Sequence, residues 1–400
     1  MSNYKIHTTT DLKQLMKMYF SDLITSRKVA WCTSVGPAEL LRSFGFEVYF
    51  PENHGALLGA SRTAMDFIPE SVKLGYAGDI CSYLTADIGS YLQKKTPLTK
   101  QYGMDGIPIP DLIVYNTNQC REVQDWFMWF ANEFNCPIFG VKPPRYLDTV
   151  SKEDIEDVSS QFKEMIPLCE KSSGNKFDID KFRHTLNLSK EATDLWKDCL
   201  NTGKNSPSPI SFFDGTIHMG PIVVLRGTEM AKEYYSKLLS ELQNNVENGI
   251  GFLEKPDSRV YWEGMPIWGK LRYFSNLFAD NNSAVVASTY CNSWVFDAFD
   301  SKDPFESSAL AYTEIFINRS EEAKFGILKK HIQDFNINGM IFHDAKTCFN
   351  NSNARFGMPQ RLKEETGIET LVIEGDLCDL RFFSEGQTTT KVETFIEQMN

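Results

Sequence analysis

The sequence has no apolar stretch that approaches the roughly 20 consecutive residues needed for a membrane-spanning helix. Its first thirteen residues (1–13) are polar and do not resemble a secretory signal peptide. These two absences argue against a membrane protein and against export. We therefore expect a protein that works in the cytoplasm and has no membrane partner.

Clusters of basic residues are also absent. The 41 Lys and Arg residues are outnumbered by 53 Asp and Glu residues, so the formal net charge is −12. A nucleic-acid surface needs Lys and Arg gathered where the phosphates bind. The composition therefore predicts no nucleic-acid partner for this chain.

The nine cysteines include no Cys-x-x-Cys pair and no compact ferredoxin-like run. Their number is odd and their spacing is wide, unlike the cysteine framework of a small secreted protein. In a reducing compartment such residues are free thiols or metal ligands. Structural zinc sites usually combine two short spacings, so zinc is the weaker metal hypothesis, although a set of four cysteines could still bind it.

The chain is long enough to form two domains, each with its own hydrophobic core. Apolar side chains recur at helical spacing near the N-terminus, and short apolar runs then alternate with helical patterns, as in a parallel sheet with crossover helices. We expect an α/β protein with two Rossmann-like or flavodoxin-like parallel-sheet domains. The predicted parts are an N-terminal helical segment at 1–28, a first α/β domain at 29–150, a mostly helical connector at 151–257 and a second α/β domain at 258–400. Strands are expected at 28–31, 48–50, 111–115, 137–141, 259–262, 284–288, 339–343 and 369–374.

The two predicted domains also contain similar sequence patterns. An apolar strand runs into a polar turn that ends at a cysteine in DLIVYNTNQC (111–120) and again in GMIFHDAKTC (339–348). In both places a helix and another strand are expected to follow. A duplicated strand–helix–strand unit is the simplest interpretation.

Four cysteines share one expected setting, the loop after a strand or the start of a helix: Cys32, Cys81, Cys120 and Cys348. Ligands of open α/β sheets bind at this edge, and helix N-termini there lower a thiol pKa. We expect the four thiols to meet in a cleft between the domains. Cys291 also follows a strand and is a candidate fifth ligand or a neighbour of the site. An iron–sulfur cluster, zinc and plain thiols remain open at this point.

Six motifs, in order along the chain, resemble the family that joins 2-hydroxyacyl-CoA dehydratases with ATP-dependent benzoyl-CoA reductases. They are WCTSVGPAELLRSFGFEVYFPENHGALLGA (31–60), DICSYLTADIG (79–89), PDLIVYNTNQCREVQDWF (110–127), FFDGTIHMGP (212–221), WEGMPIWGKLR (262–272) and HDAKTCFNNSNARFGMPQRL (343–362). The third and fourth motifs look most similar to the B subunit of the class I, ATP-dependent benzoyl-CoA reductases.

This resemblance implies a [4Fe–4S] cluster in the interdomain cleft, held by Cys81, Cys120 and Cys348. Cys32 falls where some dehydratase subunits have a serine, so its role as the fourth ligand is left open. A related branch of reductases carries a double-cubane [8Fe–9S] cluster on six cysteines and uses a position near Cys291. No cysteine lies between Cys291 and Cys348, so a single cubane is the expectation.

The implied function is that of an iron–sulfur subunit that passes low-potential electrons to an aromatic acyl-CoA for ring reduction. The alternative is a 2-hydroxyacyl-CoA dehydratase subunit, a lyase that eliminates water through a ketyl radical. The sequence has no Gly-x-x-x-x-Gly-Lys-Ser/Thr phosphate loop, so ATP hydrolysis would fall to a separate activator component. The family also implies a smaller, homologous cluster-bearing subunit and a ferredoxin-type electron donor upstream.

Polar residues near the cysteines are candidates for proton transfer. His54 and His343 suit the protonation of a radical anion at neutral pH. Ser34 either binds a thioester carbonyl or a cluster sulfide, or caps a helix that begins at Pro37, and we favour capping. Glu263 follows a predicted strand and would be costly to bury without a partner, so it is expected to be exposed or functional.

Overall fold

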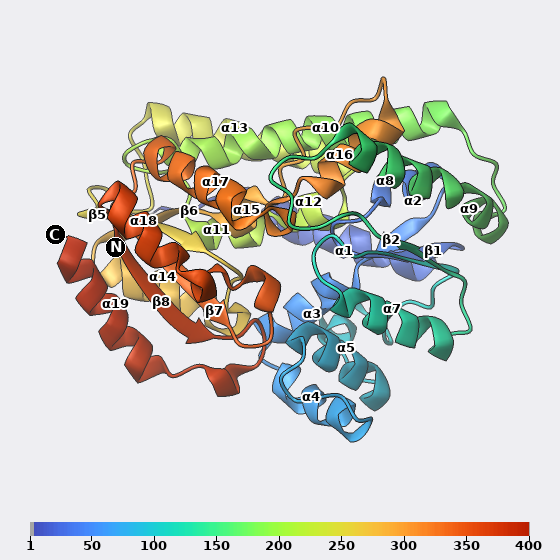
Figure 1. The fold of residues 1–400 in the computed structure, drawn as a ribbon, viewed down its shortest axis with the longest axis horizontal. Helices are drawn as coiled ribbons and strands as arrows, with labels where there is room; N and C mark the ends of the chain where they lie inside the picture. The colour runs from blue at the N-terminus through green and yellow to red at the C-terminus, as the bar shows by residue number, and fades with distance from the viewer. Residues whose placement is uncertain (1–3, 400) are drawn as a thin grey trace.

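The computed structural model describes residues 4–399, and Figure 1 shows their fold. Residues 1–3 of the predicted N-terminal segment and residue 400 of the predicted second domain lie outside the described part. Two four-stranded sheets form the framework. Their strands are β1 (Val29–Cys32), β2 (Glu47–Tyr49), β3 (Leu112–Asn116), β4 (Ile138–Val141), β5 (Ser258–Glu263), β6 (Ser283–Ser288), β7 (Gly339–Ala345) and β8 (Glu369–Gly375).

Both sheets are parallel throughout and have the same topology. The spatial orders are β2-β1-β3-β4 and β6-β5-β7-β8, so the second sheet repeats the order of the first. Val114 pairs with Phe139 in one sheet, and Ile341 pairs with Leu371 in the other. This order is the flavodoxin-like arrangement and confirms the expected fold class of two parallel-sheet domains. It also agrees with the predicted duplication.

The central strands are buried on both faces because helices cover both sides of each sheet. Every residue of β1 and β5 is buried, including the large side chains of Trp31 and Trp262. Continuous apolar strands of this kind are typical of parallel sheets. Around the first sheet lie α1 (Thr9–Thr25), α2 (Ala38–Ser43), α3 (Pro51–Ala60), α4 (Ala64–Lys73), α5 (Ser82–Gln93), α6 (Pro97–Tyr102) and α7 (Glu122–Glu133). The second sheet is surrounded by α14 (Leu271–Asp280), α15 (Thr289–Asn292), α17 (Glu321–Asp334), α18 (Met358–Thr366) and α19 (Glu385–Met399), whereas α16 (Pro304–Thr313) packs against α8 (Lys152–Glu164) and α10 (Ile179–Asn201) of the helical region described next.

Between the two sheets in sequence, the chain is helical. This part contains α8 (Lys152–Glu164), α9 (Ile166–Ser173), α10 (Ile179–Asn201), α11 (Phe212–His218), α12 (Gly220–Val224) and α13 (Glu229–Glu247). Local sequence explains several of the helix starts: Ser151 and Asp154 form a reciprocal capping box at α8, and Thr228 caps α13. Helix α10 packs against both α13 and α2, and Figure 1 shows α10 and α13 running along one side of the molecule. The limits of the predicted domains stay a prediction.

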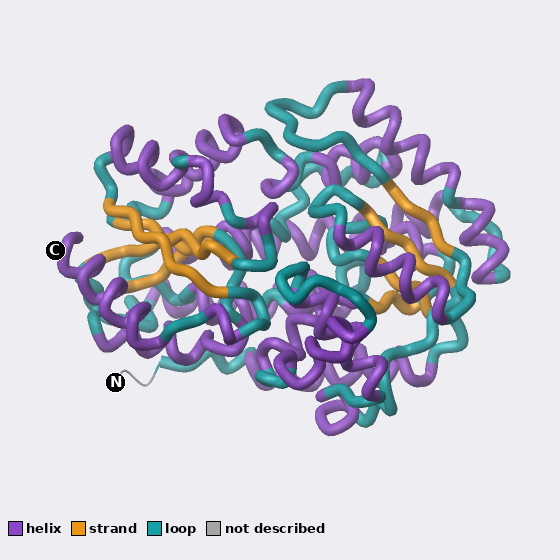
Figure 2. The backbone as a smooth tube through the Cα atoms, turned by 60° about the horizontal axis from the view of Figure 1, so that its bottom comes forward, coloured by secondary structure: helices purple, strands orange, loops and turns teal. Residues whose placement is uncertain are grey.

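The two sheets face a common central region, as Figure 2 shows, where loops and short helices fill the space between them. In each sheet the strand order reverses between the first and third strands in sequence, β1 and β3 or β5 and β7. Ligands of such folds bind beyond the carboxyl ends of the strands at this reversal. Within residues 4–399, no helix combines the length and apolar character needed to cross a membrane.

Candidate active site between the two sheets

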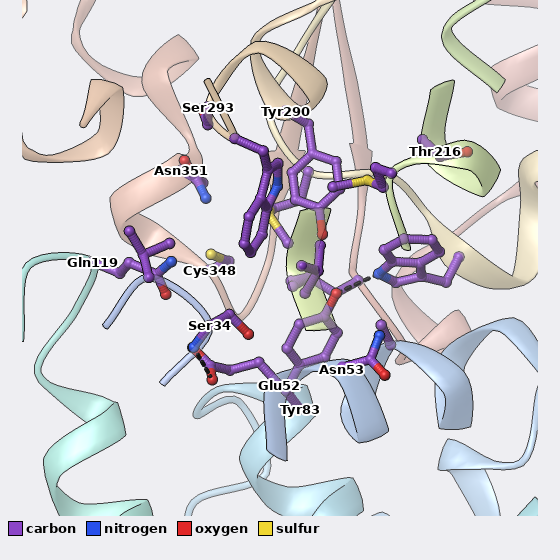
Figure 3. Close-up of a pocket in the computed structure, with 18 of the residues that line it drawn as sticks. Ser34, Glu52, Asn53, Tyr83, Gln119, Thr216, Tyr290, Ser293, Cys348 and Asn351 are labelled. Carbon is purple, nitrogen blue, oxygen red and sulfur yellow. Dashed lines mark hydrogen bonds between the residues drawn. The ribbon is translucent and has the colours of Figure 1, made fainter. Parts of the chain in front are cut away.

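A cavity of about 380 Å³ lies where the carboxyl ends of both sheets meet. Its wall includes Ser34 after β1, Cys120 after β3, Gly264 after β5 and Cys348 after β7. Both strand-order reversals therefore open onto one space. Figure 3 shows residues from both halves of the chain, among them Ser34 and Cys348, pointing into it.

Three of the predicted cysteine ligands line this cavity: Cys81, Cys120 and Cys348. Each lies where a helical segment begins. Cys81 is the N-cap residue of α5, Cys120 lies two residues before α7, and Cys348 precedes the 3₁₀ turn Phe349–Asn351. The expected convergence of thiols from both halves is therefore found for these three residues.

Burial raises the pKa of each of these three thiols, and the thiols act on one another in the same direction. The acidic side chains of Asp376 and Glu122 raise the pKa of Cys348 further. Backbone N–H groups at the starts of the helical segments act in the opposite direction, but burial dominates. Without a cationic partner the three thiols are neutral, and a bound metal centre would convert them to thiolates.

Hydrogen bonds join the chain segments that carry the thiols. The backbone N–H of Ser82 donates to the Thr347 hydroxyl at 3.0 Å, which connects the neighbours of Cys81 and Cys348. The Thr347 hydroxyl in turn donates to Asp376 Oδ2 at 2.6 Å, and the Thr347 N–H donates to the same oxygen at 2.8 Å. The start of α5, the end of β7 and the end of β8 are thus fixed to one another.

A second set of hydrogen bonds connects the loop after β3 to the loop after β7. Arg145 Nη2 donates to the carbonyl oxygen of Gln119 at 2.9 Å and to Asn350 Oδ1 at 3.2 Å. Gln119 precedes Cys120, and Asn350 lies two residues after Cys348. Two separate sets of hydrogen bonds therefore fix the positions of the three cysteine-bearing loops relative to one another.

The spacing of the thiols bears on which metal they could hold. Within the described residues, no group of three or more His, Cys, Asp or Glu side chains is close enough to hold a single metal ion. A tetrahedral zinc ion, with Zn–S bonds of about 2.3 Å, would need its thiolates nearly in contact.

Cys32 and Cys291 are not part of the cavity wall. Cys32 is the last residue of β1 and is fully buried, and the charged groups that act on its thiol are Arg226, Glu52, Glu39 and Arg42 rather than the other cysteines. The thiol of Cys291 packs toward Gly215 in α11 and is also buried. Their roles as ligands stay predictions, and the structure does not bring either residue to the other three.

Ser34 lines the cavity, but its predicted role as a helix cap is wrong. Helix α2 begins at Ala38, its N-cap residue is Pro37, and no side chain caps it. Instead, the Ser34 backbone N–H donates to Glu52 Oε2 at 2.8 Å, which Figure 3 marks. The turn after β1 therefore serves to orient a carboxyl group from the start of α3.

Glu52 is the functional candidate that the sequence did not single out. It lines the cavity, and its Oε1 has no hydrogen-bond partner among the described residues. Burial raises the pKa of Glu52 to about 7, although the backbone N–H and hydroxyl of Ser34 and the charge of Arg226 lower it. A carboxyl group with this pKa can hold and release a proton at neutral pH. The sequence signal for Glu52 is the segment PENHG (51–55), in which Glu52 lies two residues before His54.

Neither predicted histidine lines the cavity. His54 is 1% exposed, and both ring nitrogens are engaged, Nδ1 with Asp87 Oδ1 at 2.5 Å and Nε2 with Thr96 Oγ1 at 2.7 Å. His343 is fully buried and its Nδ1 donates to the carbonyl oxygen of Met265 at 2.6 Å. Burial lowers the pKa of His343, so this ring is neutral. Their roles as proton donors stay predictions that the cavity geometry does not favour.

Aromatic side chains form much of the wall. Trp268 Nε1 donates to the Tyr83 hydroxyl, and Figure 3 shows the hydroxyl groups of Tyr83 and Tyr290 pointing toward each other across the cavity. Burial raises the pKa of both phenols, and the charge of Tyr290 acts in the same direction on Tyr83. The Tyr83 oxygen accepts this hydrogen bond, and the Tyr83 hydroxyl acts on Tyr290, whose pKa it lowers. A ligand in the cavity would therefore meet phenol donors set in apolar walls.

Glu263 is buried and has a partner, so the expectation that it could be exposed is wrong. It is fully buried at the end of β5, and Asn353 Nδ2 donates to its Oε1 at 2.8 Å. Lys324 Nζ donates to Asn353 Oδ1 at 2.9 Å, which links a buried ammonium group to the same network. Burial raises the pKa of Glu263 to about 7 in spite of these contacts. The residue is absent from the cavity wall, so we interpret it as part of the core beneath the site.

Comparison with known proteins gives consistent matches over nearly the whole chain. The family described as 2-hydroxyglutaryl-CoA dehydratase, D-component, matches residues 33–399. The B subunit of the benzoyl-CoA reductase of Thauera aromatica is 29% identical over 377 residues, which cover 90% of this chain and 86% of that protein. The (R)-2-hydroxyisocaproyl-CoA dehydratase alpha subunit of Clostridioides difficile is 28% identical over 378 residues (93% and 90%), and the (R)-phenyllactyl-CoA dehydratase alpha subunit of Clostridium sporogenes is 27% identical over 381 residues (93% and 89%).

These matches confirm the resemblance inferred from the six motifs. The identities to the reductase protein and to the dehydratase proteins are nearly equal, so they do not separate the two activities. The matched region contains Ser34, Glu52 and all three cysteines of the cavity wall. The chain belongs to the 2-hydroxyglutaryl-CoA dehydratase D-component family, whose relatives include a benzoyl-CoA reductase component and the alpha subunits of 2-hydroxyacyl-CoA dehydratases.

Proposed function

We propose that this chain is the iron–sulfur subunit of an ATP-dependent enzyme of the benzoyl-CoA reductase type, which passes low-potential electrons to an aromatic acyl-CoA for ring reduction. The observation that carries the proposal is the meeting of Cys81, Cys120 and Cys348, from both halves of the chain, on one cavity with aromatic walls. A redox centre and an acyl group could share this space.

The residues present fit a [4Fe–4S] cluster held by these three cysteines. They are partly buried thiols from both halves of the chain on one cavity wall, and backbone N–H groups at the starts of helical segments face them. When bound, the cluster would supply single electrons at low potential. Acidic neighbours favour such a potential because they stabilise the more positive, oxidised state, and Glu122 and Asp376 both act on Cys348.

The protein's own groups would bind the acyl thioester and manage its protons. Glu52 would deliver the proton, held in place by the Ser34 backbone N–H. The phenol pair of Tyr83 and Tyr290 on the wall would donate to an oxygen on which negative charge develops. Trp126, Trp268 and Trp294 in the wall would exclude water, which strengthens both interactions.

The proposal includes partners because the relatives are named as components of larger enzymes, a B or an alpha subunit in each case. We propose a smaller homologous subunit with its own cluster, a separate ATP-hydrolysing activator and a ferredoxin-type donor upstream. The absence of a phosphate-loop motif from the sequence supports a separate activator.

A second candidate is a 2-hydroxyacyl-CoA dehydratase subunit. The position of Cys32, buried in β1 and outside the cavity wall, favours this alternative. Cys81, Cys120 and Cys348 would then hold a four-iron cluster without a fourth thiolate from this cavity, and the cluster would supply Lewis-acid as well as redox chemistry. That arrangement suits the removal of a hydroxyl group better than electron transfer alone.

Anaerobic purification of the chain with its partner subunits tests the cluster. We expect a brown protein with iron and sulfide near four atoms each per cluster, and zinc without sulfide would contradict the proposal. The products of an assay with benzoyl-CoA, activator, ATP and a low-potential donor then separate the two activities. A cyclic diene formed with stoichiometric electron use supports the reductase, whereas water elimination from a 2-hydroxyacyl-CoA with catalytic electron use supports the dehydratase.

Thr347→Val is expected to weaken cluster binding. The substitution keeps the shape of the side chain but leaves the buried Ser82 N–H and Asp376 Oδ2 without this shared partner. Loss of such an orienting contact typically costs about 10- to 100-fold in metal affinity. Iron retention during anaerobic chelator challenge and the spectrum of the reduced cluster measure the effect. Thr347→Ser keeps the hydroxyl group and should behave as wild type, so equal iron loss in both variants would contradict this role.

A further inference from the structure

Acidic side chains outnumber cationic ones on the cavity wall. Among the described residues that line it, the only ionisable acids besides thiols and phenols are Glu52 and Glu122, and the only cationic side chain is Lys13. Lys13 belongs to α1 and is exposed, so its ammonium group is solvated at the rim rather than held inside. A second carboxylate on a bound acyl group would meet acids and no buried cation.

The nearby buried arginine does not supply this missing charge. Arg226 is fully buried, but it is absent from the cavity wall and its guanidinium is already occupied. It pairs with Glu39 at 3.1 Å and donates to the carbonyl oxygens of Val223 at 2.8 Å and Gly36 at 2.9 Å. It could not turn to a ligand without leaving these groups unpaired in the core.

The rest of the wall is suited to apolar groups. Six aromatic side chains line the cavity, namely Tyr83, Tyr102, Trp126, Trp268, Tyr290 and Trp294. Aliphatic side chains from several elements, such as Val35, Leu57 and Met265, fill the space between them. Apolar acyl groups gain from burial against such surfaces, whereas an unpaired carboxylate loses its hydration without compensation.

We propose that this cavity selects acyl thioesters whose acyl group is uncharged and apolar, and that it rejects acyl groups with a second carboxylate. The inference rests on the proposed function, because it assumes that acyl thioesters bind here. It holds for both candidate activities. It separates this chain from a dehydratase whose substrate is a dicarboxylic acyl thioester, such as the relative named (R)-2-hydroxyglutaryl-CoA dehydratase, subunit alpha.

Two thioesters of equal chain length test the proposal. Pentanoyl-CoA and glutaryl-CoA differ only in a terminal methyl group or carboxylate, so the large CoA part contributes equally to both. Dissociation constants would be measured for the assembled, cluster-loaded enzyme without a reductant, by tryptophan fluorescence or calorimetry. We expect glutaryl-CoA to bind about 100-fold more weakly, because its carboxylate is desolvated without a partner.

A substituted cavity gives a second, independent readout. Leu57 lies in α3 on the cavity wall and is only half-buried, so a longer polar side chain can be accommodated there. Leu57→Arg should strengthen glutaryl-CoA binding by about 10-fold or more through a charged hydrogen bond. Leu57→Gln, which adds polarity without charge, should leave the difference between the two thioesters unchanged.

Each outcome has a distinct meaning. Equal binding of the two thioesters, or tighter binding of glutaryl-CoA, overturns the selectivity while leaving the proposed function intact. Binding of neither pentanoyl-CoA nor benzoyl-CoA overturns the proposed function itself and this inference with it. Preference for pentanoyl-CoA in the wild type, reduced by arginine and not by glutamine at position 57, supports the inference.

Discussion

Replacing Cys120 with serine is expected to remove most of the iron from the purified protein and to abolish turnover. Cys120 contributes one of only three thiols on the described cavity wall, and serine is a much poorer ligand for iron–sulfur clusters. Because loss of an orienting contact alone costs about 10- to 100-fold in metal affinity, loss of a ligand should cost at least about 100-fold. Iron and sulfide analysis after anaerobic purification measures the effect, together with the visible absorption of the protein.

Cys136→Ser is the matched control. Cys136 is also only partly buried, but its thiol faces the carbonyl oxygen of Pro110 and is not part of the cavity wall. This variant should keep its iron and its activity. If the Cys120 variant retained iron as well as the Cys136 variant does, the assignment of the three thiols as cluster ligands would be wrong. Cys32→Ser adds a further comparison, since the structure leads us to expect no loss of iron from it.

Glu52→Gln is expected to lower kcat by about 100-fold or more, as removal of a general acid usually does. The amide keeps the shape of the side chain and can still accept the hydrogen bond from the Ser34 N–H, so the fold should not change. It cannot release a proton at any accessible pH. Single-turnover rates with a bound acyl thioester measure the chemical step separately from electron delivery.

The pH dependence gives the sharper test of Glu52. Because burial raises the pKa of Glu52 to about 7, the wild-type group is protonated below this pH and ionised above it. A proton donor is active only when protonated, so wild-type activity should fall as the pH rises through about 7. The Glu52→Gln variant should lack this fall. Glu122→Gln is the control, because it removes another acidic group from the same wall. If this variant also lost the fall in activity above pH 7, the fall would reflect the total charge of the wall rather than the ionisation of Glu52.

The secondary structure could be predicted from the sequence because it follows from local patterns. Helix α13 covers 229–247 in the region predicted to be mostly helical, since a threonine cap precedes it and glycines follow it. The buried strands β3 and β7 each run into a cysteine-bearing turn, and their similarity predicted the duplication that the repeated strand order supports. Apolar runs between helical patterns leave few other arrangements for such a chain.

The sequence by itself determined the two parallel sheets, the family and the placement of Cys81, Cys120 and Cys348 at strand ends or helix starts, because all of these depend on neighbouring residues. Only the tertiary structure decided which side chains share a space. It brought these three thiols to one cavity, left Cys32 in the core and turned Glu52, rather than His54, toward the ligand space. The physical reason is that burial and proximity between segments hundreds of residues apart depend on how two sheets pack, and no local pattern records that packing.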